Sequence, residues 1–340
     1  MTQVHLFGAL GCAALALCCV QPPSALANDT SAELSVGGLT FTHNADVSME
    51  SEELTITPDS VNVRYRFLNQ SPNPVTLTVA FPLPDIDLSD PDANLAIPSD
   101  DGANFVGFQT KVNGAPVEFE IRQRAMLGGK DVTERVRAAG LPVLPLGAQV
   151  NRINALPAPT KERLVEEGLL VQAGTDENNR PIYDGGWIVN TSIIRQQTFP
   201  PGEAVTVEHR YRTSVGVSFD TVLRKAVRGK EALAAEFARY RADYCVTDFF
   251  LRGIDRRAGD HDENVARLQE RRISYILKTG ANWAGPIKNF RLVVDKGRAD
   301  RLVSFCGDNV KKISPTAFEM TAKEFTPQRD LKILLIVVSK

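Results

Sequence analysis

The chain has no surplus of charge of either sign. Its 39 Lys and Arg residues stand against 41 Asp and Glu residues, which gives a formal net charge of -2 at pH 7. A protein that holds nucleic acid or an anionic membrane surface needs a strongly basic field. The charge balance therefore argues against both partner classes. The hydrophobic share of 43% is that of a globular protein and excludes a disordered chain.

The short motifs of well-known enzyme classes are also missing. We find no HExxH, no GxSxG, no GxxxxGK[ST], and no GxGxxG after an expected strand. The chain has only four histidines, and no CxxC pair or histidine cluster accompanies its cysteines, which argues against a zinc site. We therefore expect no cofactor and no catalytic residue that a motif alone could identify.

What the sequence does have is an apolar N-terminal run. Residues 6–20 contain no charge, and Pro22 and Pro23 are followed by small residues at Ala25 and Ala27. This pattern predicts a secretory signal peptide over residues 1–27, cleaved after Ala27. Because a positive first segment is missing, an uncleaved membrane anchor is the alternative, but the run is shorter than the ~20 residues that span a bilayer. We expect export to the periplasm or the extracellular space, without a transmembrane segment after cleavage.

Two cysteines, Cys245 and Cys306, remain once residues 1–27 are removed. An even number of cysteines in an exported protein predicts a disulfide. In the chain-entropy description such a bridge would stabilise the fold by roughly 4 kcal/mol. Two buried free thiols are the alternative.

Alternation of apolar and polar residues dominates the mature chain. Val61, Val63, Tyr65 and Phe67 share one face of an expected strand, and residues 75–81 repeat the pattern after a polar turn with proline, as in a hairpin. A second hairpin is expected around Asn113-Gly114. One apolar face per strand is what a sandwich requires, because each sheet buries only one side. The predicted fold is mainly β with helical insertions (α+β), built as one antiparallel β-sandwich or two.

The order of these patterns divides the chain after the signal peptide. Three stretches are expected to be helical, "KDVTERVRAAG", "TKERLVEEGLLV" and "KEALAAEFARYRADYC". In the second of them Thr160 is a plausible N-cap and Gly168 a plausible terminator. The expected segments are N-terminal sandwich strands over 28–122, a helical insertion over 123–180, returning sandwich strands over 181–220, a helical segment over 221–270 and C-terminal strands over 271–340.

Longer stretches resemble a known family. The stretch "LTFTHNADVSMESEELTITPDSVNVRYRFLNQS", followed by "VAFPLPDIDL", "QTFPPGEAVTVEHRYRTSVG" and "VSFCGDNVKKISPTAFEM", is similar to an exported bacterial family known as domain of unknown function 4424. The resemblance covers nearly the whole mature chain. It implies an exported envelope protein and supplies no activity or substrate. A fainter likeness, over about half the chain, is to the vault/inter-alpha-trypsin type β-sandwich, which supports a sandwich only.

Four aspartates in "PDIDLSDPD" form a weak calcium candidate. Asp85, Asp87, Asp90 and Asp92 offer the hard oxygen ligands that Ca²⁺ prefers. Their spacing is not that of an EF-hand loop, and Pro91 stiffens the segment. A solvated acidic loop is therefore the competing interpretation.

Two histidines are the remaining chemical candidates. His43 and His209 each fall on the apolar face of an expected strand, where a histidine is usually a hydrogen-bonded core residue. If their strands are adjacent, the pair could form a metal or acid–base site with Asp46. His261 lies between Asp260 and Asp262, which are better explained as a helix N-cap. Five aromatic residues could form a carbohydrate platform or belong to the core, namely Trp187, Trp283, Tyr183, Tyr211 and Tyr275.

These observations favour an exported, non-enzymatic protein that binds or structurally supports a component of the envelope. The expected partner is an envelope protein or a polysaccharide. The rival classes are a periplasmic hydrolase or metal-dependent enzyme that uses His209 or His43, and a calcium-dependent adhesion module.

We predict that the mature, oxidised protein has no titratable thiol after denaturation, because Cys245 and Cys306 are joined. The measurement is the reaction of urea-denatured protein with a thiol-reactive dye. Protein reduced beforehand is the control and should show both thiols. Two reactive thiols in freshly exported, unreduced material would contradict the prediction.

Overall fold

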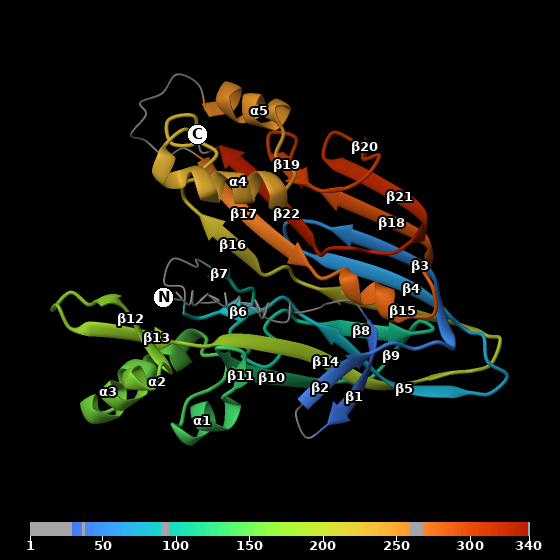
Figure 1. Ribbon diagram of the computed structural model, residues 1–340, viewed down its shortest axis with the longest axis horizontal. Helices are drawn as coiled ribbons and strands as arrows, with labels where there is room; N and C mark the ends of the chain where they lie inside the picture. Colours follow the sequence, from blue (N-terminus) through green and yellow to red (C-terminus); the bar gives the residue numbers. More distant parts are fainter. Residues whose placement is uncertain (1–28, 36–37, 90–94, 259–267, 339–340) are drawn as a thin grey trace, which may run out of the picture.

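A computed structural model of the chain describes residues 29–35, 38–89, 95–258 and 268–338. These residues form mainly antiparallel sheets with a few short helices between strands, which confirms the predicted fold class. Strands β5, β10 and β14 lie on one side of the molecule and β3, β4, β18 and β21 on the other (Figure 1). No helix in the described ranges is both long and apolar enough to cross a bilayer.

Sheet A forms one layer, in the order β11-β10-β14-β5-β1-β2 with β6 beside β14. Its strands are β1 (Thr30–Ser35), β2 (Gly38–Thr42), β5 (Val75–Pro82), β6 (Ile86–Asp87), β10 (Glu120–Leu127), β11 (Lys130–Asp131) and β14 (Ile188–Phe199).

Sheet B forms the facing layer, in the order β20-β21-β18-β3-β4-β15-β8-β9. Its strands are β3 (Val47–Ile56), β4 (Val61–Asn69), β8 (Gln109–Val112), β9 (Ala115–Pro116), β15 (Ala204–Tyr211), β18 (Ile287–Asp295), β20 (Lys311–Lys312) and β21 (Ala317–Phe325).

Sheet C, in the order β19-β22-β17-β16-β7, continues the structure towards the helices α4 and α5. Its strands are β7 (Leu95–Ala96), β16 (Val215–Ser218), β17 (Leu268–Tyr275), β19 (Leu302–Phe305) and β22 (Leu331–Val338).

The hairpin of β12 (Leu170–Thr175) and β13 (Pro181–Gly185) forms a separate two-stranded sheet. The helices are α1 (Thr133–Ala138), α2 (Val150–Asn154), α3 (Ala158–Glu166), α4 (Ala234–Asp243) and α5 (Asp248–Ala258), with 3₁₀ turns η1 (Gly147–Gln149), η2 (Glu231–Leu233) and η3 (Lys278–Asn282).

The alternation in residues 61–81 predicts the buried faces correctly but not the pairing. Val63, Tyr65 and Phe67 on β4 are at most 2% exposed, as expected. The expected hairpin is wrong, because β4 pairs with β3 and β15 in sheet B, whereas β5 pairs with β1 and β14 in sheet A. The turn crosses from one sheet to the other, so the two apolar faces meet across the core instead of lying side by side.

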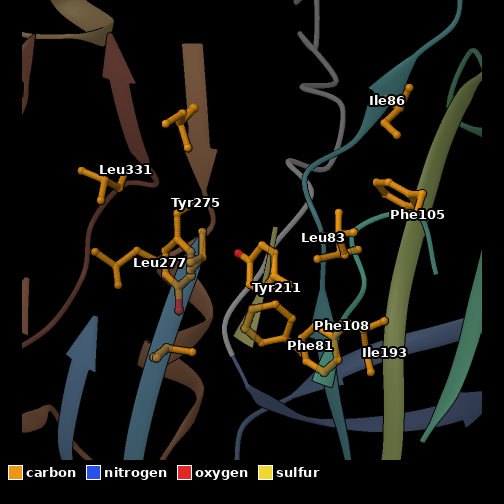
Figure 2. Close-up of a cluster of buried hydrophobic side chains, with 14 of the residues drawn as sticks. Phe81, Leu83, Ile86, Phe105, Phe108, Ile193, Tyr211, Tyr275, Leu277 and Leu331 are labelled. Atoms are coloured by element: carbon orange, nitrogen blue, oxygen red, sulfur yellow. The ribbon is translucent and has the colours of Figure 1, made fainter. Parts of the chain in front are cut away.

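The C-terminal strands do not form a second sandwich. β18 pairs in parallel with β3, so it and β21 extend sheet B. The remaining C-terminal strands belong to sheet C, and Tyr275 and Ile333 lie in the same hydrophobic core as Val63 and Phe81. The phenols of Tyr65 and Tyr275, 2.9 Å apart, link sheets B and C inside that core. Figure 2 shows Tyr211, Phe81 and Phe108 gathered opposite Tyr275.

Local signals for turns and helix ends are mostly confirmed. Asn113 and Gly114, both at positive φ, connect β8 and β9 as predicted. Gly168, also at positive φ, follows the end of α3. Thr160 is not the N-cap, because α3 begins two residues earlier at Ala158. Pro159 is accommodated in the first turn, where backbone amides have no partner within the helix.

A buried ion pair fixes the N-terminal end of the described chain inside the core. The side chains of Asp29 and Arg195 are 0% and 3% exposed, and Asp29 Oδ2 lies 2.9 Å from an Arg195 guanidinium nitrogen. Asp29 Oδ1 lies 3.0 Å from His209 Nε2, and the Trp283 indole donates a hydrogen bond to the Asp29 carbonyl at 2.7 Å. One residue thereby contacts sheet A through Arg195 and sheet B through His209.

The protonation of this cluster makes the fold sensitive to acid. Burial opposes the charge of Asp29, but Arg195 and His209 outweigh it and hold its pKa well below the usual 3.8. Burial lowers the pKa of His209 below its usual 6.5 despite the attraction of Asp29. In both groups the unfolded chain binds protons more readily, so stability falls as the pH drops below about 6.5 and again below about 4.

We predict that Asp29→Asn lowers the free energy of unfolding by about 3–5 kcal/mol, because Arg195 is left as an unpaired buried charge. Urea denaturation at pH 7 measures the change. The control is the double variant Asp29→Leu/Arg195→Met, which removes both charges and should recover most of the loss. A single variant as stable as the wild type would contradict a structural role for the pair.

Candidate functional site

A polar cleft of about 640 Å³ lies beside sheet C. Residues of β16 and β17 form its floor, α4 forms one wall, and residues at β6 of sheet A line it as well. We call it the sheet C cleft and define it by Glu270 and Arg272 on β17, Tyr240 on α4, and Asp85 and Asp87 at β6.

The two faces of β17 explain why polar groups gather here. Ile273 and Tyr275 point into the main core, so Glu270, Arg272 and Ser274 take the opposite face by the two-residue period of a strand. On neighbouring β22, Leu334 and Ile336 use that outer face to pack beneath α4 and α5. The helices therefore cover only part of the outer face, and the polar part remains open as the floor of the cleft.

Helix α4 directs one side of its surface at this floor. Glu236, Tyr240 and Tyr244 are spaced by four residues, and Arg239 and Asp243 lie at the three-residue spacing beside them. Such positions share one helix face, and all five line the cleft. Asp243 Oδ2 also accepts a hydrogen bond of 2.8 Å from Lys332 Nζ of β22, which ties the end of α4 to sheet C.

Glu270 is the centre of the site. Its side chain is 1% exposed, and its Oε1 accepts a hydrogen bond of 2.6 Å from the Tyr240 hydroxyl. Arg272 Nη1 donates to the same oxygen and also to the Tyr240 hydroxyl, at 3.3 Å. Gly216 faces Arg272 across the strand pair, where a Cβ would come within 3.1 Å of the guanidinium, so the absent side chain leaves that space to Arg272.

The environment of Tyr240, Tyr244 and Arg272 determines their protonation states. Burial, together with the carboxylate of Glu270, raises the pKa of Tyr240 well above that of a free phenol. Burial raises the pKa of Tyr244 to about 12. Burial opposes the charge of Arg272, but Tyr240 and Glu270 outweigh it and raise its pKa. Near neutral pH the cleft floor therefore holds neutral phenols beside a charged guanidinium.

The β6 side of the cleft contains two of the calcium candidates. Asp85 accepts a hydrogen bond of 2.6 Å from Asn190, and partial burial raises its pKa to about 6. Asp87 accepts hydrogen bonds from the amide and hydroxyl of Ser89. Asp90 and Asp92 lie outside the described residues. Within the described ranges no group of three or more metal-ligating side chains could hold an ion, so calcium remains a prediction from sequence.

The expected disulfide is confirmed and supports the α4 wall. Cys245 follows α4, Cys306 follows β19, and the two are bonded with their Cα atoms 5.0 Å apart. Next to the bridge, the Ser304 hydroxyl donates a hydrogen bond of 2.8 Å to the Tyr244 carbonyl. The C-terminal end of α4 is thus held against sheet C by a covalent bond and a hydrogen bond.

A second hollow of about 360 Å³ lies on the outer face of sheet B. Its floor carries a row of alternating charges on neighbouring strands, namely Arg291, Glu53, Arg64, Glu208 and Lys111. Each charge faces opposite charges in register, and Arg64 lies 3.4 Å from Glu208. The positive and negative charges of this row compensate one another, and none of these five side chains is buried without a partner. The sheet C cleft is therefore the stronger candidate for a ligand site.

The two histidines occupy different environments. His43 follows β2, outside any strand, and is exposed, so its expected place on a buried strand face is wrong. His209 is buried against Asp29, with the rings of Phe81 and Phe108 about 5.0 Å away. Asp46 is exposed as well. Among the described residues no hydrogen bond or ion pair joins His43, His209 and Asp46, and neither histidine lines the sheet C cleft.

The other sequence candidates do not form a surface site. Trp187, Trp283, Tyr211 and Tyr275 are at most 4% exposed and belong to the core, while Tyr183 is half-buried beneath the Lys161 ammonium. They therefore form no exposed carbohydrate platform. His261, with Asp260 and Asp262, lies outside the described residues.

Sequence reasoning missed Glu270, Tyr240 and Arg272. Residue 270 fell at the expected boundary between a helical segment and a strand, so the alternation of Leu268, Glu270 and Arg272 on one strand face went unused. A charged residue at a buried position of a strand is the signal that could have found it. The contact of Glu270 with Tyr240, 30 residues earlier, requires the tertiary structure.

Comparison with known proteins adds a family but no activity. A family model described as "Domain of unknown function (DUF4424)" matches residues 27–334. Among curated proteins, none matches this chain at a significant level.

Similar solved structures are distant. One is a Legionella pneumophila protein provisionally described as a nutrient-binding protein, with a TM-score of 0.43 and 14% identity over 92% of this chain and 71% of that one. Another is a variant of an M1 zinc metallopeptidase from Deinococcus radiodurans, with a TM-score of 0.26 and 9% identity over 87% of this chain and 43% of that one. These values carry no functional argument, so the interpretation depends on the cleft itself.

We predict that Tyr240→Phe lowers the free energy of unfolding by about 1–2 kcal/mol, because Glu270 loses its phenol donor while buried. Thermal and urea unfolding measure the effect. Tyr244→Phe is the matched control, since no hydrogen bond of its hydroxyl is found among the described residues, and it should change stability by less than about 0.5 kcal/mol. Equal effects of the two substitutions would contradict the role assigned to Tyr240.

Proposed function

We propose, from the premise that the chain belongs to the family described as domain of unknown function 4424, that it is an exported binding protein whose sheet C cleft holds a small polar ligand. The protein acts by binding and not by chemical conversion. The family description itself supplies neither ligand nor activity.

The observation that carries the proposal is a buried polar cluster beneath an open cleft. Glu270, Tyr240 and Arg272 are held in a defined arrangement at the floor of a hollow of about 640 Å³. Ligand sites commonly combine a preformed concavity with a few fixed polar groups. A buried ion pair is often no more stable than an apolar replacement, so its presence at the floor of a cleft is in keeping with a role in recognition.

Two features support export. The uncharged run of residues 6–20 and the small residues before position 28 have the pattern of a cleaved signal peptide. The disulfide between Cys245 and Cys306 is in keeping with an oxidising compartment.

An enzyme that uses His209 or His43 receives less support. His209 is enclosed between the sheets, where its imidazole contacts Asp29 and aromatic rings. His43 is exposed and does not line the sheet C cleft. A general base needs to reach a substrate proton, and a closed core offers no room for one.

We predict that a low-molecular-weight filtrate of the periplasm raises the melting temperature of the mature protein, and that Ser218→Trp abolishes this rise. A ligand that binds only the folded state stabilises it by mass action. Ser218 pairs with Glu270 across β16 and β17, so a large side chain at 218 lies over the cleft floor. Thermal-shift assays with and without filtrate measure the effect.

Thr321→Trp is the matched control, because Thr321 is an exposed position on β21, away from the cleft. This variant should retain the full rise in melting temperature. No rise with the wild type, or an equal rise in the Ser218→Trp variant, would overturn the proposed function.

A further inference from the structure

One oxygen of the central carboxylate has no partner. Glu270 Oε1 accepts hydrogen bonds from Tyr240 and Arg272, but Oε2 has none among the described residues although the side chain is 1% exposed. Nearly all buried polar atoms in folded proteins are hydrogen-bonded. A buried carboxylate oxygen without a partner, in a residue that lines an open cleft, indicates a donor that arrives with a ligand.

The lining of the cleft carries more negative than positive charge. Six carboxylates line the cleft against three cationic side chains, Arg239, Arg272 and Lys332. Each of the three cations is already paired, Arg272 with Glu270, Lys332 with Asp243 and Arg239 with Glu236. Asp220 is paired with Arg224, which does not line the cleft. Asp85 and Asp87, which enter from β6, form no ion pair in the described part of the chain and accept only neutral hydrogen bonds. The carboxylates without a cationic partner are therefore Asp85 and Asp87, both on the β6 side of the cleft and within the described residues.

We infer that the ligand carries at least one protonated amine, whose ammonium group donates a hydrogen bond to Glu270 Oε2. This inference depends on the proposed function, since it names the chemical class that the cleft holds. An ammonium group supplies donors and positive charge together and replaces the missing partner. A second ammonium group or hydroxyls on the ligand would meet Asp85 and Asp87.

Other ligand classes fit the cleft less well. An anion would meet the excess of carboxylates and find all three cations already paired. A calcium ion needs about six to eight oxygen ligands, and no suitable cluster exists within the described ranges. A neutral sugar could donate a hydroxyl to Glu270 Oε2 but would leave the excess of negative charge uncompensated.

The experiment separates the periplasmic filtrate on a cation-exchange resin at pH 7 and tests both fractions in the thermal-shift assay. We expect the stabilising component to be retained on the resin. Stabilisation by the unretained fraction alone would overturn the amine inference and leave the proposed function standing. No stabilisation by either fraction or by the unfractionated filtrate would overturn the proposed function itself.

Calorimetric titration then tests the named contact with putrescine, spermidine and lysine, each compared with succinate and glucose. We expect saturable binding of at least one amine, weakened at least about tenfold by Glu270→Gln, because the variant lacks the charge at the contact. Binding should also weaken as salt is raised from low to physiological strength. Glu53→Gln, an exposed carboxylate on the outer face of sheet B, is the control and should bind as the wild type does.

A second variant keeps the test decisive if Glu270→Gln unfolds. Asp87→Asn changes an exposed carboxylate at the cleft and should fold normally while weakening amine binding severalfold. Binding of succinate or glucose without binding of any amine would overturn the inference, as would amine affinities that neither cleft variant lowers.

Discussion

The burial of Asp29 between the sheets is the interaction on which the arrangement of the layers depends. Its carboxylate contacts Arg195 of sheet A and His209 of sheet B, and its carbonyl accepts a hydrogen bond from Trp283, just before β18. A charge in a core is tolerated only when it is paired, so the two sheets must meet with Arg195 and His209 in reach of one residue. Apolar packing alone allows small shifts of one layer over the other, whereas this contact specifies one relative position.

The crossing of the chain between layers creates the space for the cleft. Because the turn after β4 leads into sheet A, the chain that leaves β5 passes through β6 and presents Asp85 and Asp87 to the edge of sheet C. Sheet C buries Tyr275 and Ile333 on its inner face and offers an outer face that α4 and α5 cover only in part. The cleft lies over the part of this outer face that the two helices leave uncovered. The disulfide after α4 keeps the α4 wall of the cleft in place.

Whether a buried charged group has all its partners distinguishes the structural cluster at Asp29 from the proposed binding site at Glu270. Arg195 and Asp29 are buried together and neutralise each other, as a structural pair should. Glu270 is buried with one oxygen unpaired, in a cleft where Asp85 and Asp87 form no ion pair within the described residues. The buried groups around Asp29 need no ligand, because they are paired with one another. Glu270 lacks one hydrogen-bond donor, which a ligand would supply, so the sheet C cleft and not the cluster of Asp29 and His209 is proposed as the binding site.

The sequence by itself determined the mainly β class, the buried faces of β4, the Asn113-Gly114 turn and the pairing of Cys245 with Cys306. These properties follow from local periodicity, from backbone preferences, or from a choice among only two cysteines. The tertiary structure alone decided that β4 and β5 belong to different sheets, that β18 lies parallel to β3, and that Glu270 meets Tyr240 opposite Asp85. Alternation states which side of a strand is buried but contains no information about which strand is its neighbour, so contacts between distant segments, and with them the site, could not be predicted.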